Sequence, residues 1–149
     1  SGACAGSSSI LEMNVPLSGP SGPPVRSHPD DQYPFTVLAS LNGGIGANWA
    51  VCRIGRNSNH GLLPTQRNGG LWYRLGAVPS APTGVDVRIT GYSFNTNNVL
   101  SLTQQTHAGP LLQIGTDSLC YEVDTTAGNG GSPVIEEGSG NVIGVQTHN

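Results

Sequence analysis

Apolar and polar positions alternate over short stretches of the chain, which predicts a protein built from many short β-strands. Residues 85–92 give the clearest example, because apolar and polar side chains follow one another with a period of two, as in a half-buried strand. Short strands at roughly ten-residue spacing indicate a barrel or a sandwich. The pattern predicts further strands at 10–15, 33–41, 71–75, 99–106, 111–114, 118–123 and 142–145, and a turn that leads into a buried strand within 43–52.

Proline-rich stretches divide these strands. Residues 16–31 carry Pro20, Pro23, Pro24 and Pro29 among serines and glycines, which predicts an exposed loop with extended, polyproline-like segments. A linker between two domains is the alternative interpretation of this stretch. Residues 79–84 are also rich in proline and predict a connection between two halves of the chain.

Composition limits the size and class of the protein. A chain of 149 residues is long enough for one domain with a core and too short for two ordinary domains. With 22 Gly, 11 Pro and 10% charged residues, little room is left for helices. A net charge of −3 without a basic cluster argues against a nucleic-acid partner. No apolar run approaches the ~20 residues that span a bilayer, and no signal peptide begins at Ser1, so we expect a mature, soluble fragment.

The three cysteines do not suggest a metal centre. Cys4, Cys52 and Cys120 are far apart and lack the spacing of metal ligands, so neither a metal nor another cofactor is predicted. An odd number of cysteines leaves at least one thiol free or paired outside this chain.

Residues 124–135 form the most distinctive stretch. Gly128, Gly130 and Gly131 surround Asn129 and precede Ser132 and Pro133, which predicts a loop between two strands with unusual backbone angles. Successive N–H groups that point outward from such a loop form a nest that binds anions. A plain hairpin connection is the alternative, because glycine-rich loops are common.

This stretch resembles the Gly-Asn-Ser-Gly-Ser-Pro-Val loop of chymotrypsin-fold serine proteases, in particular the bacterial branch that is similar to glutamyl endopeptidases. Gly130 stands at the position of the nucleophilic serine. Ser132 lies two residues beyond that position and is therefore no substitute for it. Residues 57–64 and 104–110 also resemble segments of these bacterial proteases.

The resemblance implies an all-β fold of two six-stranded antiparallel barrels with a site in the cleft between them. The chain would be a single trypsin-like domain of residues 1–149, truncated at both ends. Its first barrel would comprise about residues 1–78 and its second about 84–149. The family is secreted, which implies an extracellular location.

The resemblance also identifies the other two triad positions. Ala3, directly before Cys4, occupies the position of the catalytic histidine, and the family's partner for Cys4 would lie upstream. Asn48 occupies the position of the catalytic aspartate, although by itself it would be interpreted as a turn residue. All three triad positions are thus substituted, and only the amides of Gly128 and Gly130 would remain as an oxyanion hole.

Three further positions correspond to substrate recognition in the family. Thr125 matches a threonine that contacts an acidic substrate side chain. Gln146 lies where a recognising histidine would be, and His148 follows two residues later. Glutamine donates a hydrogen bond to a carboxylate but adds no positive charge, so a preference for glutamate does not carry over. Cys52 and Cys120 would lie in different barrels, as buried and unbonded small apolar residues.

These observations predict an inactive serine-protease homologue with a cleft that binds an extended peptide by strand addition. Peptide or protein segments are the expected partners, together with neighbouring chains that complete the missing strands. One alternative is an active endopeptidase whose triad was deliberately replaced. A second alternative is a scaffold domain of a larger extracellular assembly.

Overall fold

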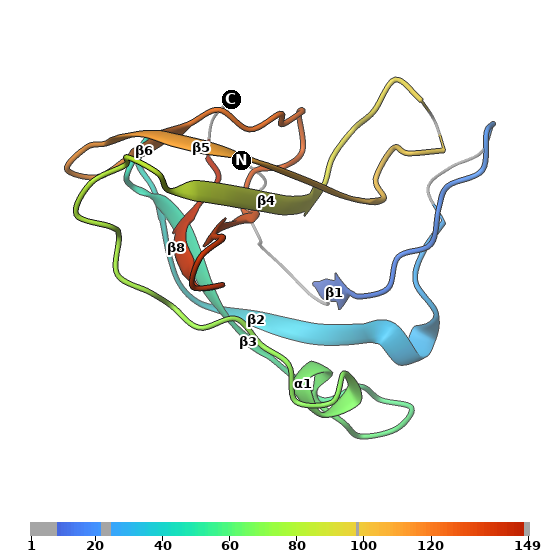
Figure 1. Ribbon diagram of the computed structural model, residues 1–149. Coiled ribbons are helices and arrows are strands. Elements are labelled where there is room, and N and C mark those ends of the chain that lie inside the picture. Colours follow the sequence, from blue (N-terminus) through green and yellow to red (C-terminus); the bar gives the residue numbers. More distant parts are fainter. Residues whose placement is uncertain (1–8, 22–24, 98, 148–149) are drawn as a thin grey trace.

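The computed structural model describes residues 9–21, 25–97 and 99–147, and these residues fold almost entirely as β-structure (Figure 1). Within this part of the chain the helical elements are a single 3-10 turn, η1 (Pro29–Asp31), and one short helix, α1 (Pro64–Arg67). The strands are β1 (Ile10–Glu12), β2 (Gln32–Asn42), β3 (Asn48–Ile54), β4 (Asp86–Tyr92), β5 (Gln104–Ile114), β6 (Leu119–Tyr121), β7 (Pro133–Glu136) and β8 (Val142–Val145).

The strands form two antiparallel sheets, one of which is a half-barrel. The first sheet has the order β1-β2-β3, and the second has the order β6-β5-β4-β7-β8 (Figure 1). The prediction of an all-β protein is confirmed, and the arrangement is consistent with a chymotrypsin-like β fold. Among the described residues the sheets contain three and five strands, where six in each were predicted.

A tight hairpin joins β2 to β3 and brings the two sheets together. The Gly43 amide donates to the Ala47 carbonyl at 2.7 Å, and the turn contains Gly44 and Gly46 with φ values of 93° and 77°. A left-handed backbone of this kind favours glycine. A Cβ atom at Gly46 would also lie 2.6 Å from the Cβ of Asp117, so the hairpin packs closely against the second sheet.

The apolar core belongs to the second sheet. Val87 and Ile89 on β4 are buried, as the period-two pattern predicts, and they pack with Leu111, Val134 and Ile143. In the first sheet Tyr33 is the buried apolar residue among those described. Most of the folding free energy from apolar burial therefore comes from one half of the molecule.

Strand β5 differs from the prediction. Residues 99–102 form turns, and one strand of 11 residues runs through Gly109 and Pro110, where two shorter strands were predicted. Pro110 lacks an N–H group, but its carbonyl oxygen accepts from the Glu122 amide at 3.0 Å and keeps the ladder to the segment after β6. Gly109 permits this approach, because a Cβ atom there would collide with the Glu122 carbonyl oxygen.

Residues 71–75 do not form the predicted strand. Leu75 makes an isolated parallel bridge with Val142, where the Gly76 amide donates to the Val142 carbonyl at 2.9 Å. The apolar side chains of this segment are largely exposed, with Leu71 at 72% and Trp72 at 65%. An apolar run becomes a strand only when a neighbouring strand pairs with it, and the described residues supply one bridge.

Strand β1 and α1 also depart from the prediction. Strand β1 ends at Glu12, earlier than predicted, and the chain leaves the extended region at Asn14, whose φ is 52°. Helix α1 was not predicted; it begins at Pro64, whose fixed φ suits the first helical position. Residues 16–21 and 25–28 form a loop before β2, as predicted, whereas Pro29–Asp31 form η1. Glu12 anchors the loop through Arg26 and the Ser27 amide.

Candidate functional site

The glycine-rich loop lies between β6 and β7 and is held by its own hydrogen bonds. Gly128 and Gly131 have φ values of 104° and 94°, a backbone that other residues rarely adopt. The Asn129 amide donates to Thr126, and the Ser132 amide donates to Asn129 at 3.0 Å. The loop therefore has a defined conformation rather than that of an open connection.

The end of β8 fixes the second half of the loop. The Gly131 amide donates to the Gln146 carbonyl at 2.8 Å, and the Gln146 amide donates to the Ser132 carbonyl at 2.9 Å. These paired bonds continue the β7–β8 ladder beyond Pro133.

Several amides of the loop have no acceptor among the described residues, and two of them belong to Gly128 and Gly130. The amides of Gly128 and Gly130 donate to no acceptor within the described part of the chain, whereas those of Asn129, Gly131 and Ser132 all do. Amide donors in a turn of this kind bind an anion or a substrate carbonyl oxygen. The sequence predicted these two amides as the oxyanion hole, and that role stays a prediction.

Gly130 itself is open. No heavy atom lies within 4 Å of the place where its Cβ would be, and its φ lies outside the left-handed region. A serine side chain would therefore fit at this position without collision. In this chain the position has no side chain, so the loop has no nucleophile there.

Gly91 on β4 packs closely against the loop, and no functional role was predicted for it. A Cβ atom at Gly91 would collide with the Ser132 hydroxyl and would lie 2.5 Å from Asn129 Oδ1. Both polar side chains are buried, and Asn129 Oδ1 has no hydrogen-bond partner among the described atoms. An isolated glycine inside a strand pattern signals such a close approach, and this signal was present in residues 85–92.

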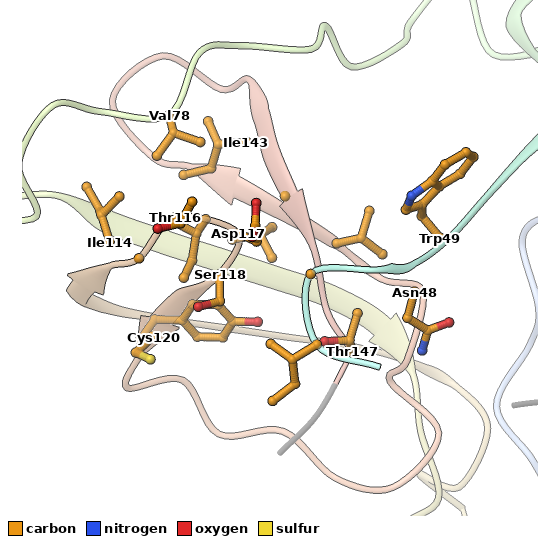
Figure 2. A pocket seen from close by; sticks show the side chains of 18 of the residues that line it. Asn48, Trp49, Val78, Ile114, Thr116, Asp117, Ser118, Cys120, Ile143 and Thr147 are labelled. Carbon is orange, nitrogen blue, oxygen red and sulfur yellow. The ribbon is translucent and has the colours of Figure 1, made fainter. Parts of the chain in front are cut away.

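A cavity of about 780 Å³ lies between the two sheets near this loop (Figure 2). Its wall is largely apolar and includes Trp49, Ile114 and Ile143. Asn48 and Thr147 lie near one another at one end of the cavity (Figure 2). Because Thr147 directly follows Gln146, this end of the cavity is connected to the glycine-rich loop.

The structure describes two of the three predicted triad positions, Asn48 and Gly130. Asn48 is half-buried, begins β3 opposite Asn42 and lines the cavity. Gly130 is exposed on the loop and is not part of the cavity wall. Ala3 lies outside the described residues, so the convergence of the three positions stays a prediction.

The predicted substrate positions occupy different environments. Thr125 is half-buried, and His148 lies outside the described residues, as does Cys4. Gln146 is only 2% exposed, and its Oε1 accepts from the Tyr121 hydroxyl. Burial, with a smaller contribution from Cys120, raises the pKa of Tyr121, which keeps the phenol protonated as a donor. The Gln146 side chain therefore joins β6 to the end of β8.

Cys52 and Cys120 carry free thiols and belong to different sheets. Cys120 is exposed and Cys52 is half-buried, so the prediction that both are buried was wrong. The reason is that β6 and β3 are both edge strands, and most side chains of β3 are exposed. Within the described ranges, no group of three His, Cys, Asp or Glu side chains is placed to hold a metal ion. No helix among these residues is long and apolar enough to span a membrane.

Comparison with known proteins supports a protease-like fold. No family model matches the chain. A glutamyl endopeptidase of Bacillus licheniformis is 34% identical over 88 residues, a match that covers 49% of this chain and 28% of the endopeptidase. The chain thus matches little more than a quarter of that enzyme's length. The similarity agrees with the trypsin-like resemblance of the glycine-rich loop and with the antiparallel β architecture.

Proposed function

We propose that this protein is a serine-protease homologue without catalytic activity that binds an extended peptide at the glycine-rich loop. The observation that carries the proposal is the pair of available amides at Gly128 and Gly130, in a loop that is held by the bonds of the Asn129, Gly131 and Ser132 amides. Such amides would donate hydrogen bonds to the carbonyl oxygen of a bound peptide, as an oxyanion hole does. The chain would form a single protease-like domain over residues 1–149.

The absence of activity follows from the residues at the triad positions. Hydrolysis by this mechanism needs a hydroxyl nucleophile, a neutral imidazole that takes its proton, and an acid that orients the imidazole. Ala3, Asn48 and Gly130 supply none of these groups. Loss of a whole triad lowers the rate about a million-fold and leaves ~10³ to 10⁴ over water.

The three positions that correspond to substrate recognition in the family determine the selectivity that we expect of the site. Thr125 would contact the peptide side chain that enters the site, together with His148. Gln146 would act mainly by holding Tyr121, because its own side chain is buried. Since neither Thr125 nor Gln146 adds a positive charge, we propose no preference for acidic side chains at this loop.

The test restores the triad. The triple variant Ala3→His, Asn48→Asp, Gly130→Ser should show measurable peptidase activity, whereas each single variant should show almost none, because triad members act as a unit. Because the space around Gly130 is open, the serine side chain would fit there without collision. Activity is measured with peptides that carry Glu, Arg or Phe before the scissile bond, and circular dichroism confirms that each variant is folded.

Two outcomes would contradict the proposal. Cleavage by the unmodified chain would show that it is an enzyme. Failure of a folded triple variant on every peptide would show that the loop no longer supports this chemistry, and would favour the scaffold alternative.

The scaffold alternative has one observation in its favour. Large apolar side chains are exposed on the first sheet and on residues 71–75, including Leu38 at 54% and Leu75 at 88%. A domain that packs against neighbouring chains would cover such surfaces. We propose an extracellular location in either case, because the resemblance is to secreted proteases.

A further inference from the structure

Strand β3 forms an unpaired edge of the first sheet. It hydrogen-bonds to β2 on one side, and no other described strand pairs with its second side. The register irregularity of this hairpin lies at Leu38 on β2, so the β3 backbone is regular over its seven residues. The strand contains no proline. A regular, unprotected edge of this length is a template for another strand.

The side chains of β3 offer both apolar and charged contacts. Trp49, Val51 and Arg53 share one face because they are two residues apart. Trp49 is 42% exposed and Val51 is 52% exposed. The Arg53 side chain is exposed and forms no ion pair with any described residue. The face therefore presents two apolar positions followed by one unpaired cation.

The segment of sequence that contains β3 has a net charge opposite in sign to that of the whole chain. Between Asp31 and Asp86 the sequence contains no acidic residue but four arginines, at positions 53, 56, 67 and 74. Beyond Val85, one arginine accompanies six acidic residues. Arg67 pairs with Asp31, and Asp117 lies against Gly46 in the turn before β3, so the positive charge offered by the strand itself is that of Arg53.

We propose that the free edge of β3 binds an extended peptide as an additional strand. The peptide would carry an acidic side chain opposite Arg53 and apolar side chains opposite Val51 and Trp49. Backbone hydrogen bonds would supply most of the affinity, and alternate side chains would supply the selectivity. Trp49 also lines the cavity near the glycine-rich loop, but the β3 edge is a different surface and the proposal does not depend on the one made for that loop.

The experiment measures the binding of dye-labelled peptides by fluorescence anisotropy. The probe has the sequence Glu-Thr-Val-Thr-Val with blocked ends, and a matched peptide has Lys in place of Glu. The unmodified protein should bind the Glu peptide about threefold or more tightly than the Lys peptide, as expected for an exposed cross-strand charge pair. Methylation of the peptide amides that face β3 should abolish binding of both.

Substitutions distinguish a direct contact of the peptide with Arg53 from an effect of the overall charge of the protein. Arg53→Glu should reverse the preference, and Arg53→Gln should remove it without reversal. Arg74→Glu changes the net charge by the same amount but lies off the strand, so it should keep the preference. Circular dichroism establishes that each variant is folded.

Three results would overturn the proposal. One is equal binding of the two probes by the unmodified protein, or no binding at all. Another is an equal loss of preference in Arg53→Glu and Arg74→Glu, which would assign the effect to the overall field. The third is a dimer in sedimentation that the probe does not dissociate, since β3 would then be occupied by a second copy.

Discussion

Gly91 on β4 packs against the glycine-rich loop and Gly130 belongs to that loop, and the two positions differ in the space around them. A Cβ atom at Gly91 meets the side chains of Asn129 and Ser132, whereas one at Gly130 meets nothing within 4 Å. The same chemical change should therefore have opposite effects at the two positions.

We expect Gly91→Ala to lower the free energy of unfolding by about 1–3 kcal/mol, because the loop or strand must shift to admit the methyl group. Gly130→Ala should be neutral or stabilising by about 0.4–1 kcal/mol, because it restricts the unfolded chain. Urea denaturation followed by circular dichroism measures both. A larger loss in Gly130→Ala than in Gly91→Ala would contradict the described loop conformation.

Arg88 and Glu137 make a bidentate ion pair. Arg88 Nε lies 2.6 Å from Glu137 Oε1, and Nη2 lies 2.9 Å from Oε2. Hydrogen bonding and then charge attraction from Arg88 hold the pKa of Glu137 below its ordinary value of 4.5. The pair is exposed to solvent, so its contribution to stability is small.

The sign of the pH dependence follows from the lowered pKa. The contribution of Glu137 is present above its ordinary pKa of 4.5 and is lost as the pH falls through the lower pKa of the folded state. Glu137→Gln should therefore lower the melting temperature at pH 7, and the difference from the unmodified protein should shrink toward pH 2. Glu122→Gln, at another exposed carboxylate, serves as the control. A difference that does not change with pH would contradict the assignment.

At the scale of elements, β5 shows how one strand separates buried from exposed positions. Leu111 is 4% exposed, whereas its neighbour Leu112, at the register irregularity against β6, is 55% exposed. Leu111 packs with Val87 and Val134 in the core of the second sheet.

Leu111→Ala should lower the free energy of unfolding by about 2–5 kcal/mol, because it removes buried contacts and leaves a cavity. Leu112→Ala should change it by no more than about 0.5 kcal/mol, as is usual on a surface. Equal effects of the two substitutions in urea denaturation would show that the register of β5 is wrong.

The elements also show what the sequence predicted and what it did not. The alternation in residues 85–92 predicted β4 correctly, because one face of this strand is buried and the other is not. Residues 71–75 are equally apolar but remain largely unpaired, since pairing depends on a neighbouring strand that local sequence does not reveal.

The candidate site also has features that the local sequence predicts and features that it does not. The positive φ values of Gly128 and Gly131 and the link to the end of β8 are local consequences of the glycine-rich sequence. The cavity that contains Asn48 depends on how the two sheets pack, and neither its volume nor its wall follows from residue spacing. The burial of Gln146 under Tyr121 likewise depends on the pairing of distant strands.

At the scale of the whole molecule, the two sheets differ in how they are stabilised. Strand β4 lies between two partners, and Val87 and Ile89 are buried at 0% and 3% exposure. Strand β3 has one partner and mostly exposed side chains. Local stability follows buried apolar contacts and protected hydrogen bonds, so it should be unequal in the two halves.

Hydrogen exchange measured by mass spectrometry should reveal this difference. Amides of β4 should exchange slowest, and those of β3 should exchange well before them, because the first sheet opens without disrupting the core of the second. Exchange of both strands at one common rate would indicate a single cooperative unit and would contradict the expectation.

The exposure of both tryptophans has a spectroscopic consequence. Trp49 and Trp72, the two indoles of the chain, are 42% and 65% exposed. An indole that is already in contact with water emits at long wavelength in the native state, and its emission maximum shifts little when the chain unfolds. Intrinsic emission would therefore report poorly on denaturation of this protein, although a ligand that covered Trp49 would shift its spectrum to shorter wavelength.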